Sequence, residues 1–463
     1  MLIRHDFSPQ PFEVVTTAFS VQNARVIDIH LHEGVFEHVF LLVKDPEQQI
    51  RGVFTWKTRL KHFTLGESPE TTSNNALPGK IQPGVWTITL IRPTYLTGYV
   101  AFEVSTRHAS PDEGENRQQA VLSQRWNNPV NPATKWYRGD LHCHSFYSDG
   151  RVSLDDICLS ATANHFDYLA ITDHSVVTTA LPRSFSPVIP ATEITFDNEV
   201  HYNVFGLSRL IDYGRYFSRE GITKNEILTA LFHDLVAEGA VVSINHPFSQ
   251  GMSLRHDFDM RYIQLFEVIN APHLADCPID NEKAIRFYDF LWQQGYRLTA
   301  TGGSDAHKPD SAGVYPLGKP STFIHAHGLS IAGLLGGLKN GRTMIANGVN
   351  CQLHIRQRGR DIYPGDEVHG EIDFSAACES RPLTWRLIKN ARCIDECVSD
   401  RFTGSAELNE GDSVRLEART GDETVFFTTP VHCALSQPVE FSFAVLLARF
   451  LSAENNTRQD AAC

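Results

Sequence analysis

Between residues 136 and 347, short apolar runs rich in β-branched residues alternate with longer amphipathic segments. Residues 168–172 and 240–244 are typical of buried strands. Residues 154–164 have the spacing of a helix, which Ser153 and Asp156 would begin as a capping box. Strands that alternate with helices form parallel sheets or βα barrels. The pattern therefore predicts an α/β fold for this part of the chain.

The segments on either side have short β-like runs and turns but little helical spacing. A length of 463 residues suggests about three domains. We predict an N-terminal β-rich, sandwich-like domain over residues 1–108, a linker over 109–135, the α/β domain over 136–347, a C-terminal β-rich domain over 348–451, in which residues 439–447 form a strand, and a flexible tail over 452–463.

A histidine-rich stretch, RGDLHCHSFYSDG, occupies residues 138–150. Alternate side chains of a strand share a face, so His142 and His144 point the same way, as two ligands of a metal ion would. The same alternation occurs at His30 and His32, where it is typical of a solvated strand face. The two stretches differ because further candidate ligands come after the first one along the chain, whereas the second lacks such partners.

These further candidates stand at the predicted ends of successive strands. The carboxyl ends of the strands of a βα barrel lie on one rim, where residues distant in sequence converge. Mixed imidazole and carboxylate ligands suit zinc, manganese or iron, and their number exceeds what one ion can use, so we expect two or three divalent ions. The candidate ligands are His142, His144, Asp149, His174, Glu193, His201, His246, Asp305 and His307.

The net charge of −13 disfavours a broad nucleic-acid interface and favours a small anionic substrate that metal ions bind locally. The N-terminus lacks the apolar core of a signal peptide, and the longest apolar run, residues 441–451, is too short to span a membrane. The nine cysteines are scattered, without zinc-finger spacing. We therefore expect a cytoplasmic protein with reduced cysteines and no membrane contact.

The order of five motifs, DLHCHSFYSDG, AITDH, ATEITF followed by His201, NHP and GGSDAH, resembles the PHP (polymerase and histidinol phosphatase) family of metal-dependent hydrolases. The resemblance covers residues 136–347 and implies a distorted βα barrel with a two- or three-metal site. A β-rich domain before the barrel is similar to the CehA/McbA-type subgroup of metallohydrolases, which includes a carbamate-ester hydrolase.

The resemblance also implies roles for individual residues. It assigns His142, His144, Glu193 and Asp305 to one ion, Asp149, His174 and the shared Glu193 to a second, and His201, His246 and His307 to a third. Asp149 stands where some members have a histidine, which would change the affinity or the identity of the second ion. Asp140 and Asp173 would orient the ligands without binding an ion themselves.

These inferences predict hydrolysis of an ester bond by a water molecule that metal ions activate. A small phosphoester is favoured because clustered cations match a multiply charged group, and Arg183 and Lys308 are candidate phosphate-binding residues. Asp305 or His307 would carry a proton to the leaving group. Two alternatives stay open: hydrolysis of a carboxylic or carbamate ester, and a binding or scaffolding protein stabilised by a structural metal site.

Overall fold

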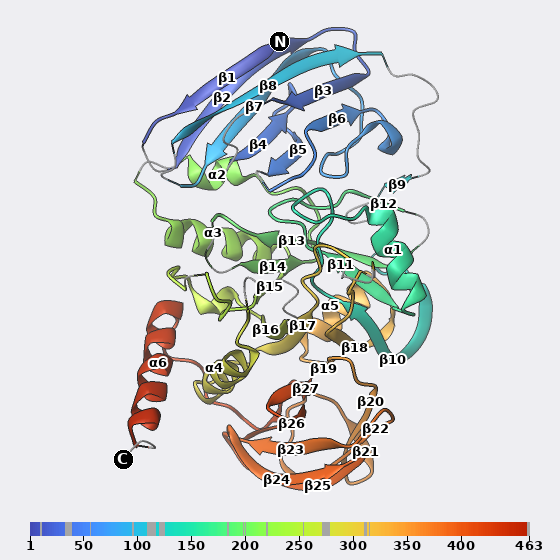
Figure 1. Cartoon of the computed structure of the whole chain (residues 1–463), viewed down its shortest axis with the longest axis vertical. Coiled ribbons are helices and arrows are strands. Elements are labelled where there is room, and N and C mark those ends of the chain that lie inside the picture. Colours follow the sequence, from blue (N-terminus) through green and yellow to red (C-terminus); the bar gives the residue numbers. More distant parts are fainter. Residues whose placement is uncertain are drawn as a thin grey trace.

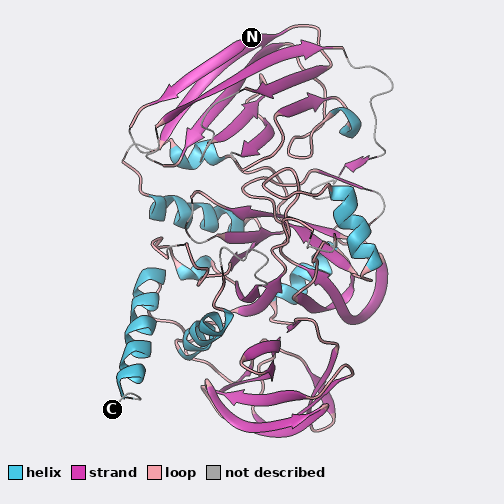
Figure 2. Ribbon diagram, viewed as in Figure 1, coloured by secondary structure: helices cyan, strands magenta, loops and turns pink. Residues whose placement is uncertain are grey.

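The protein has a mixed α/β fold with many strands and few helices (Figure 2). A computed structural model describes residues 1–460, except 10–11, 33–38, 56, 95–96, 109–116, 120–125, 183–184, 198, 200, 219–220, 253, 271–277, 310–312 and 314. A β-sandwich, a central α/β unit and a second β unit follow one another from the N-terminus (Figure 1).

Two four-stranded sheets enclose the core of the N-terminal sandwich, in the orders β1-β8-β3-β6 and β2-β7-β4-β5. In β7, Trp86, Ile88 and Leu90 are buried and alternate with more exposed residues, as in a strand with one face on a core. The strands are β1 (Leu2–Phe7), β2 (Glu13–Val21), β3 (Val26–Leu31), β4 (Phe40–Lys44), β5 (Ile50–Thr55), β6 (His62–Gly66), β7 (Gly84–Arg92) and β8 (Gly98–Arg107).

The central unit alternates strands and helices, as the sequence predicts. Helix α1 (Leu154–Ala163) begins with the expected capping box, in which Ser153 Oγ accepts from the Asp156 amide at 3.1 Å. The other helices are α2 (Tyr213–Phe217), α3 (Lys224–Ala237), α4 (Asn281–Gln293) and α5 (Ile331–Lys339). The strands are β10 (Asn131–Asp140), β11 (Tyr168–Ile171), β13 (Val188–Ile194), β14 (Tyr202–Phe205), β15 (Val241–Ile244), β16 (Leu265–Asn270), β17 (Thr299–Gly303), β18 (Ser321–Leu329) and β19 (Thr343–Ala346), with β9 (Arg117–Gln119) paired to β12 (Ala180–Pro182).

The expected barrel is not confirmed, because the strand order β17-β16-β15-β14-β13-β11-β10-β18-β19 is open, with β17 at its end. β14 runs antiparallel to both of its neighbours, which interrupts the parallel pattern. The loops that come after β10 and β17 nevertheless meet. The Asp305 amide donates to His142 O at 2.8 Å, and the His144 amide donates to Ala306 O at 3.0 Å. These bonds bring the end of strand β17, at one edge of the open order, beside the end of the interior strand β10 and the histidine motif.

The C-terminal β unit continues the central sheet, because β19 pairs with β27. β10 also begins at Asn131, within the predicted linker. The strands are β20 (Cys351–Gln357), β21 (Arg360–Ile362), β22 (Gly370–Cys378), β23 (Leu383–Lys389), β24 (Arg392–Ser399), β25 (Arg401–Leu408), β26 (Ser413–Thr420), β27 (Glu423–Thr428) and β28 (Val431–His432).

The predicted strand at 439–447 and the predicted flexible tail are wrong, because Phe443–Asp460 form helix α6. Phe443, Leu446 and Phe450 are buried in the core that surrounds α4, and Arg286 of α4 donates to Glu454 at 2.6 Å. An apolar spacing of three and four residues in this segment favours a helix packed on α4 over a strand. None of the helices in the described part of the chain is long and apolar enough to cross a membrane.

One buried ion-pair network joins the C-terminal unit to the central unit. Arg415 of β26 donates to both carboxylate oxygens of Asp289 in α4, at 2.8 and 2.7 Å, and to Glu417 at 2.6 Å. Burial disfavours the charge of Arg415, but Asp289 and Glu417 outweigh it and raise the pKa of the guanidinium. The same guanidinium lowers the pKa of the Glu417 carboxyl against the effect of burial, so Arg415 and Glu417 are both charged inside the protein.

Candidate metal centre

The nine predicted ligands come together at the ends of the central strands. His142 and His144 follow β10, His174 follows β11, and Glu193 lies in β13. His201 immediately precedes β14, His246 follows β15, and Asp305 and His307 follow β17. The loop after β10 also contacts the N-terminal sandwich, because the Arg59 amide donates to Ser148 O at 3.1 Å. The convergence expected for strand ends is therefore present although the sheet is open.

Glu193 is the centre of the cluster, and its side chain is fully buried. Burial opposes its ionisation, but the surrounding His142, His201 and His174 outweigh that and hold the pKa of its carboxyl well below the usual range. Its two oxygens lie 3.0–3.5 Å from ring nitrogens of His142, His144, His174, His201 and His246. A buried carboxylate that faces five imidazoles could hold a divalent metal ion together with them.

Two further carboxylates flank Glu193. Asp305 Oδ1 lies 3.3 Å from His142 Nε2 and 3.1 Å from His144 Nε2. Asp149 Oδ1 lies 3.4 Å from His174 Nε2 and 3.1 Å from His307 Nε2. Burial disfavours the charge of both carboxyls, yet the neighbouring histidines lower the pKa of each well below its ordinary value. Both groups are therefore ionised and able to bind a cation.

The histidines differ in protonation because their neighbours differ. Burial, together with His307 and His174, lowers the pKa of His144 to about 3, and burial lowers that of His201 to about 3. Burial also opposes charge on His307, but Asp149 outweighs it and raises the pKa of His307 to about 9. The neutral rings of His144 and His201 are in the state that binds a metal ion, whereas His307 must first release a proton.

Unsatisfied polar atoms provide a test of whether the residues fit metal ions. Among the described residues, buried atoms without a hydrogen-bond partner include His142 Nε2, Glu193 Oε2 and Asp149 Oδ1, both ring nitrogens of His201, and His246 Nδ1. Buried polar atoms are almost always hydrogen-bonded, so this concentration at one place requires another partner. Divalent ions with nitrogen and oxygen ligands supply that partner, and the residues present fit them.

The way the ligands group differs from the sets implied by the family resemblance, and His246 groups with His142 and Glu267. His307 belongs to a group with His144, Asp149 and His174, whereas the resemblance placed it with His201 and His246. The reason is electrostatic, since the Asp149 carboxylate attracts the His307 ring at 3.1 Å. Two other compact groups are His142, His144 and Glu193, and His174, Glu193 and His201.

Glu267 of β16, which supports the cluster, is not among the residues predicted from the sequence. Its Oε1 lies 2.9 Å from His142 Nδ1, and its Oε2 accepts from the His246 amide at 2.9 Å and from Asn270 Nδ2 at 3.0 Å. A carboxylate on the far nitrogen of a histidine fixes the ring so that the other nitrogen faces the metal. The sequence signal was a single glutamate within the strand LFEVIN, in which every residue is buried.

Lys57, from the loop after β5, was also missed, because no local pattern connects the sandwich to the motif. Its Nζ lies 3.1 Å from His174 Nε2 and 3.6 Å from Asp149 Oδ2. The side chain is mostly buried, with 14% exposure. Only the packing of the two units shows that this lysine is part of the site.

Asp140 and Asp173 bind backbone and hydroxyl groups of the ligand loops. Asp140 accepts from the amides of His142, Ser304 and Gly318, at 3.0, 3.1 and 2.6 Å, and so joins the loops after β10 and β17. Asp173 accepts from the Ser145 amide and from the hydroxyls of Ser145 and Ser148, at 2.6–2.7 Å. These hydrogen bonds fix the backbone of the loops that carry the candidate metal ligands.

Only one of the two predicted phosphate-binding residues lies in the described part of the chain. Lys308 is exposed, although it follows His307 directly. Arg183 lies outside the described residues. The assignment of substrate binding to this pair stays a prediction.

Comparisons with known proteins bear on part of the central unit. The family model of the PHP domain matches residues 140–232, and the resemblance inferred from the motifs is confirmed for this segment. The matched segment contains the first six of the nine candidate ligands. The CehA/McbA-type subgroup stays a prediction.

No curated protein matches this chain, and the solved structures similar to it include the following two. One is a two-domain protein containing a predicted PHP-like metal-dependent phosphoesterase from Bacteroides vulgatus ATCC 8482, at 19% identity and a TM-score of 0.36, over 67% of this chain and 100% of the other. The second is an FMN-binding beta-glucuronidase from Facaelibacterium prausnitzii L2-6, at 9% identity and a TM-score of 0.20, over 93% and 92%. Likenesses at these TM-scores do not define a function.

Proposed function

We propose that the protein is a metal-dependent hydrolase of ester bonds, and that its substrate is a small phosphoester. The observation that carries the proposal is the buried Glu193 carboxylate, which faces five imidazoles between two further ionised carboxylates. A purely structural site would be closed by four ligands, whereas nine candidate ligands would suffice for more than one ion and would leave positions for water and substrate.

Two or three divalent ions at this centre would lower the pKa of a bound water and neutralise charge on the attacked oxygen. The protein's own groups orient these ligands. Glu267 holds the His142 ring through Nδ1, and Thr195 Oγ1 lies 2.8 Å from His174 Nδ1. Asp140 and Asp173 fix the loops that carry the ligands.

Asp305 and His307 are the proposed proton carriers. Each is partly exposed, with side-chain exposures of 16% and 15%, while His142 and Glu193 are fully buried. Groups at the open side of the centre can reach both the leaving group and solvent. Separate Asp305→Asn and His307→Gln variants distinguish the two, since loss of the proton donor slows substrates with poor leaving groups more than p-nitrophenyl esters.

The test is metal analysis by plasma mass spectrometry together with turnover of p-nitrophenyl phosphate, bis-p-nitrophenyl phosphate and p-nitrophenyl acetate. We expect two or three ions per chain, metal-dependent turnover, and loss of both in a His142→Ala, His174→Ala double variant. The matched control is the His30→Ala, His32→Ala double variant, because those rings lie on the exposed end of β3 and at a rim of the sandwich.

The same experiment decides between the remaining readings. Cleavage of the acetate ester in preference to both phosphate esters would replace the phosphoesterase proposal by a carbon-ester hydrolase of the predicted CehA/McbA type. Bound metal without turnover of any ester after exchange of manganese, zinc and iron would favour the scaffolding protein. Fewer than one ion per chain after reconstitution would contradict the metal centre itself.

A further inference from the structure

The loop between β5 and β6 of the N-terminal sandwich is bound to the loop that carries Asp149. The Arg59 amide donates to Ser148 O at 3.1 Å, and Arg59 Nε donates to Asp149 O at 2.9 Å. Thr58 Oγ1 donates to Phe146 O at 3.4 Å. Backbone groups of the ligand loop are therefore fixed by a unit that is remote from it in sequence.

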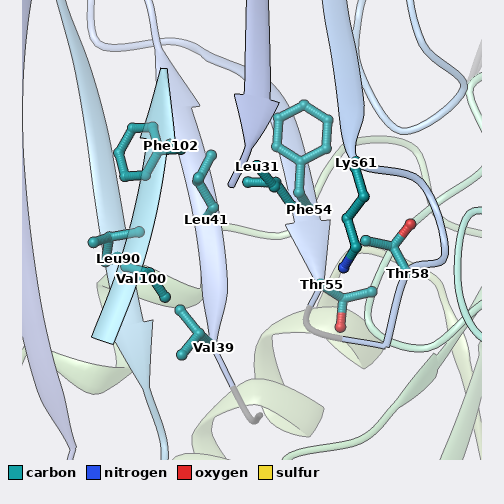
Figure 3. Close-up of a pocket in the computed structure, with 10 residues that line it drawn as sticks. All are labelled: Leu31, Val39, Leu41, Phe54, Thr55, Thr58, Lys61, Leu90, Val100 and Phe102. Carbon is teal, nitrogen blue, oxygen red and sulfur yellow. The ribbon is translucent and has the colours of Figure 1, made fainter. Parts of the chain in front are cut away.

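The sandwich also holds its own side of this contact firmly. Thr58 is buried and its hydroxyl accepts from the Leu60 amide at 3.2 Å. Figure 3 shows Thr55, Thr58 and Lys61 together at the end of β5, beside the apolar side chains of Leu31 and Phe54. A loop anchored on a packed core can position a side chain with little loss of conformational entropy on binding.

Lys57 lies in this loop and extends into the candidate metal centre. Its Nζ is 3.1 Å from His174 Nε2 and 3.6 Å from Asp149 Oδ2, at the group formed by His144, Asp149, His174 and His307. A mostly buried ammonium beside a cation site is unfavourable unless negative charge is close to it. Asp149 supplies part of that charge, and it also faces His174 and His307.

Lys57 adds a positive charge at the side of the centre formed by His144, Asp149, His174 and His307. An anionic group that enters a dry site needs positive charge beside it, together with donors that point at its oxygens. The Lys57 ammonium supplies both at this position.

We propose that Lys57 is a substrate-binding residue contributed by the N-terminal sandwich, and that its ammonium contacts an anionic oxygen of the substrate beside Asp149 and His174. The inference rests on the proposed function, since it assumes that a negatively charged substrate reaches this centre. It gives the sandwich a specific part in the site, because lysine offers three donors on a long stem that adjusts to the bound group.

The test measures binding of inorganic phosphate to the full-length, metal-reconstituted protein by calorimetry, with metal content determined on the same samples. We expect Lys57→Met and Lys57→Gln to retain the metal stoichiometry and the melting temperature of the wild type and to bind phosphate roughly 10- to 100-fold more weakly. Lys57→Arg is expected to recover part of this loss. The matched control is Lys80→Met, which removes an exposed lysine of the same sandwich.

Unchanged phosphate affinity in Lys57→Met and Lys57→Gln at full metal content would overturn the inference, as would a wild-type holoprotein that binds no phosphate. A loss of bound metal in both variants would also overturn it, because Lys57 would then position the ligands. The measurement requires no turnover. If the wild-type protein binds phosphate but cleaves no ester, the proposed function is contradicted, and the effect of the Lys57 variants on phosphate affinity can still be determined.

Discussion

Replacing Glu267 by glutamine tests whether the buried carboxylate behind His142 tunes the metal centre. Glu267 receives three donors, His142 Nδ1 at 2.9 Å, the His246 amide at 2.9 Å and Asn270 Nδ2 at 3.0 Å. A glutamine has one acceptor oxygen, so its amide nitrogen must face a donor. If that donor is His142 Nδ1, the ring must move its proton to Nε2, the nitrogen that faces Glu193 and Asp305 at 3.2 and 3.3 Å.

A proton on Nε2 prevents His142 from binding a metal ion there. Carboxylates that orient metal-bound histidines contribute roughly 10- to 100-fold in affinity, so we expect Glu267→Gln to weaken binding of one ion by about 1.4–2.7 kcal/mol. The assay is a Zn²⁺ or Mn²⁺ titration against a competing chelator, with plasma mass spectrometry for stoichiometry. Glu371→Gln, at an exposed position of β22, is the matched control. Binding within twofold of the wild type, at the same stoichiometry and in a folded variant, would refute the reasoning.

Three further predictions concern stability. Arg415→Met leaves Asp289 and Glu417 without their shared partner, and we expect a loss of about 3 kcal/mol in the free energy of unfolding, measured by urea denaturation; a change below 0.5 kcal/mol on that scale would contradict a structural role. The pKa of His307 is raised to about 9 in the folded protein from an ordinary value of 6.5, so its ion pair with Asp149 stabilises the metal-free protein fully below pH 6.5 and is lost as the pH rises through about 9. Denaturation in EDTA at pH 6.5 and pH 9 measures this loss, and an equal loss in His307→Gln would exclude His307 as its source. Metal at 100 times its dissociation constant is expected to raise the free energy of unfolding by about 2.7 kcal/mol over the EDTA-treated protein, and identical unfolding curves would show that the native state binds no ion.

The sequence alone determined the α/β character of the central unit and the composition of the candidate metal centre. Both features depend on patterns of residues that are close together in the sequence. Alternating strand and helix periods show in the order of residues, and a ligand that ends a strand is visible as a histidine or carboxylate after an apolar run. His142, His144, His174 and Glu193 were found in this way, and the structure brings them together.

The strand predicted for residues 439–447 was wrong for a physical reason. Residues 439–451 are apolar enough for a strand or a helix, and short apolar runs do not distinguish the two by composition. The choice depends on what the segment packs against. Here α4 offers an apolar face, so Phe443, Leu446 and Phe450 are buried along one side of α6.

Only the tertiary structure decided three features of the centre: the pairing of His307 with Asp149, the support of His142 by Glu267, and the entry of Lys57 from the sandwich. Each joins residues between 117 and 158 positions apart. Contacts at such separations depend on how strands pair and how units pack, and burial and long-range electrostatics set their strength. The amino-acid sequence therefore identifies the candidate ligands. The fold determines how these ligands group and which neighbouring residues shift their pKa values.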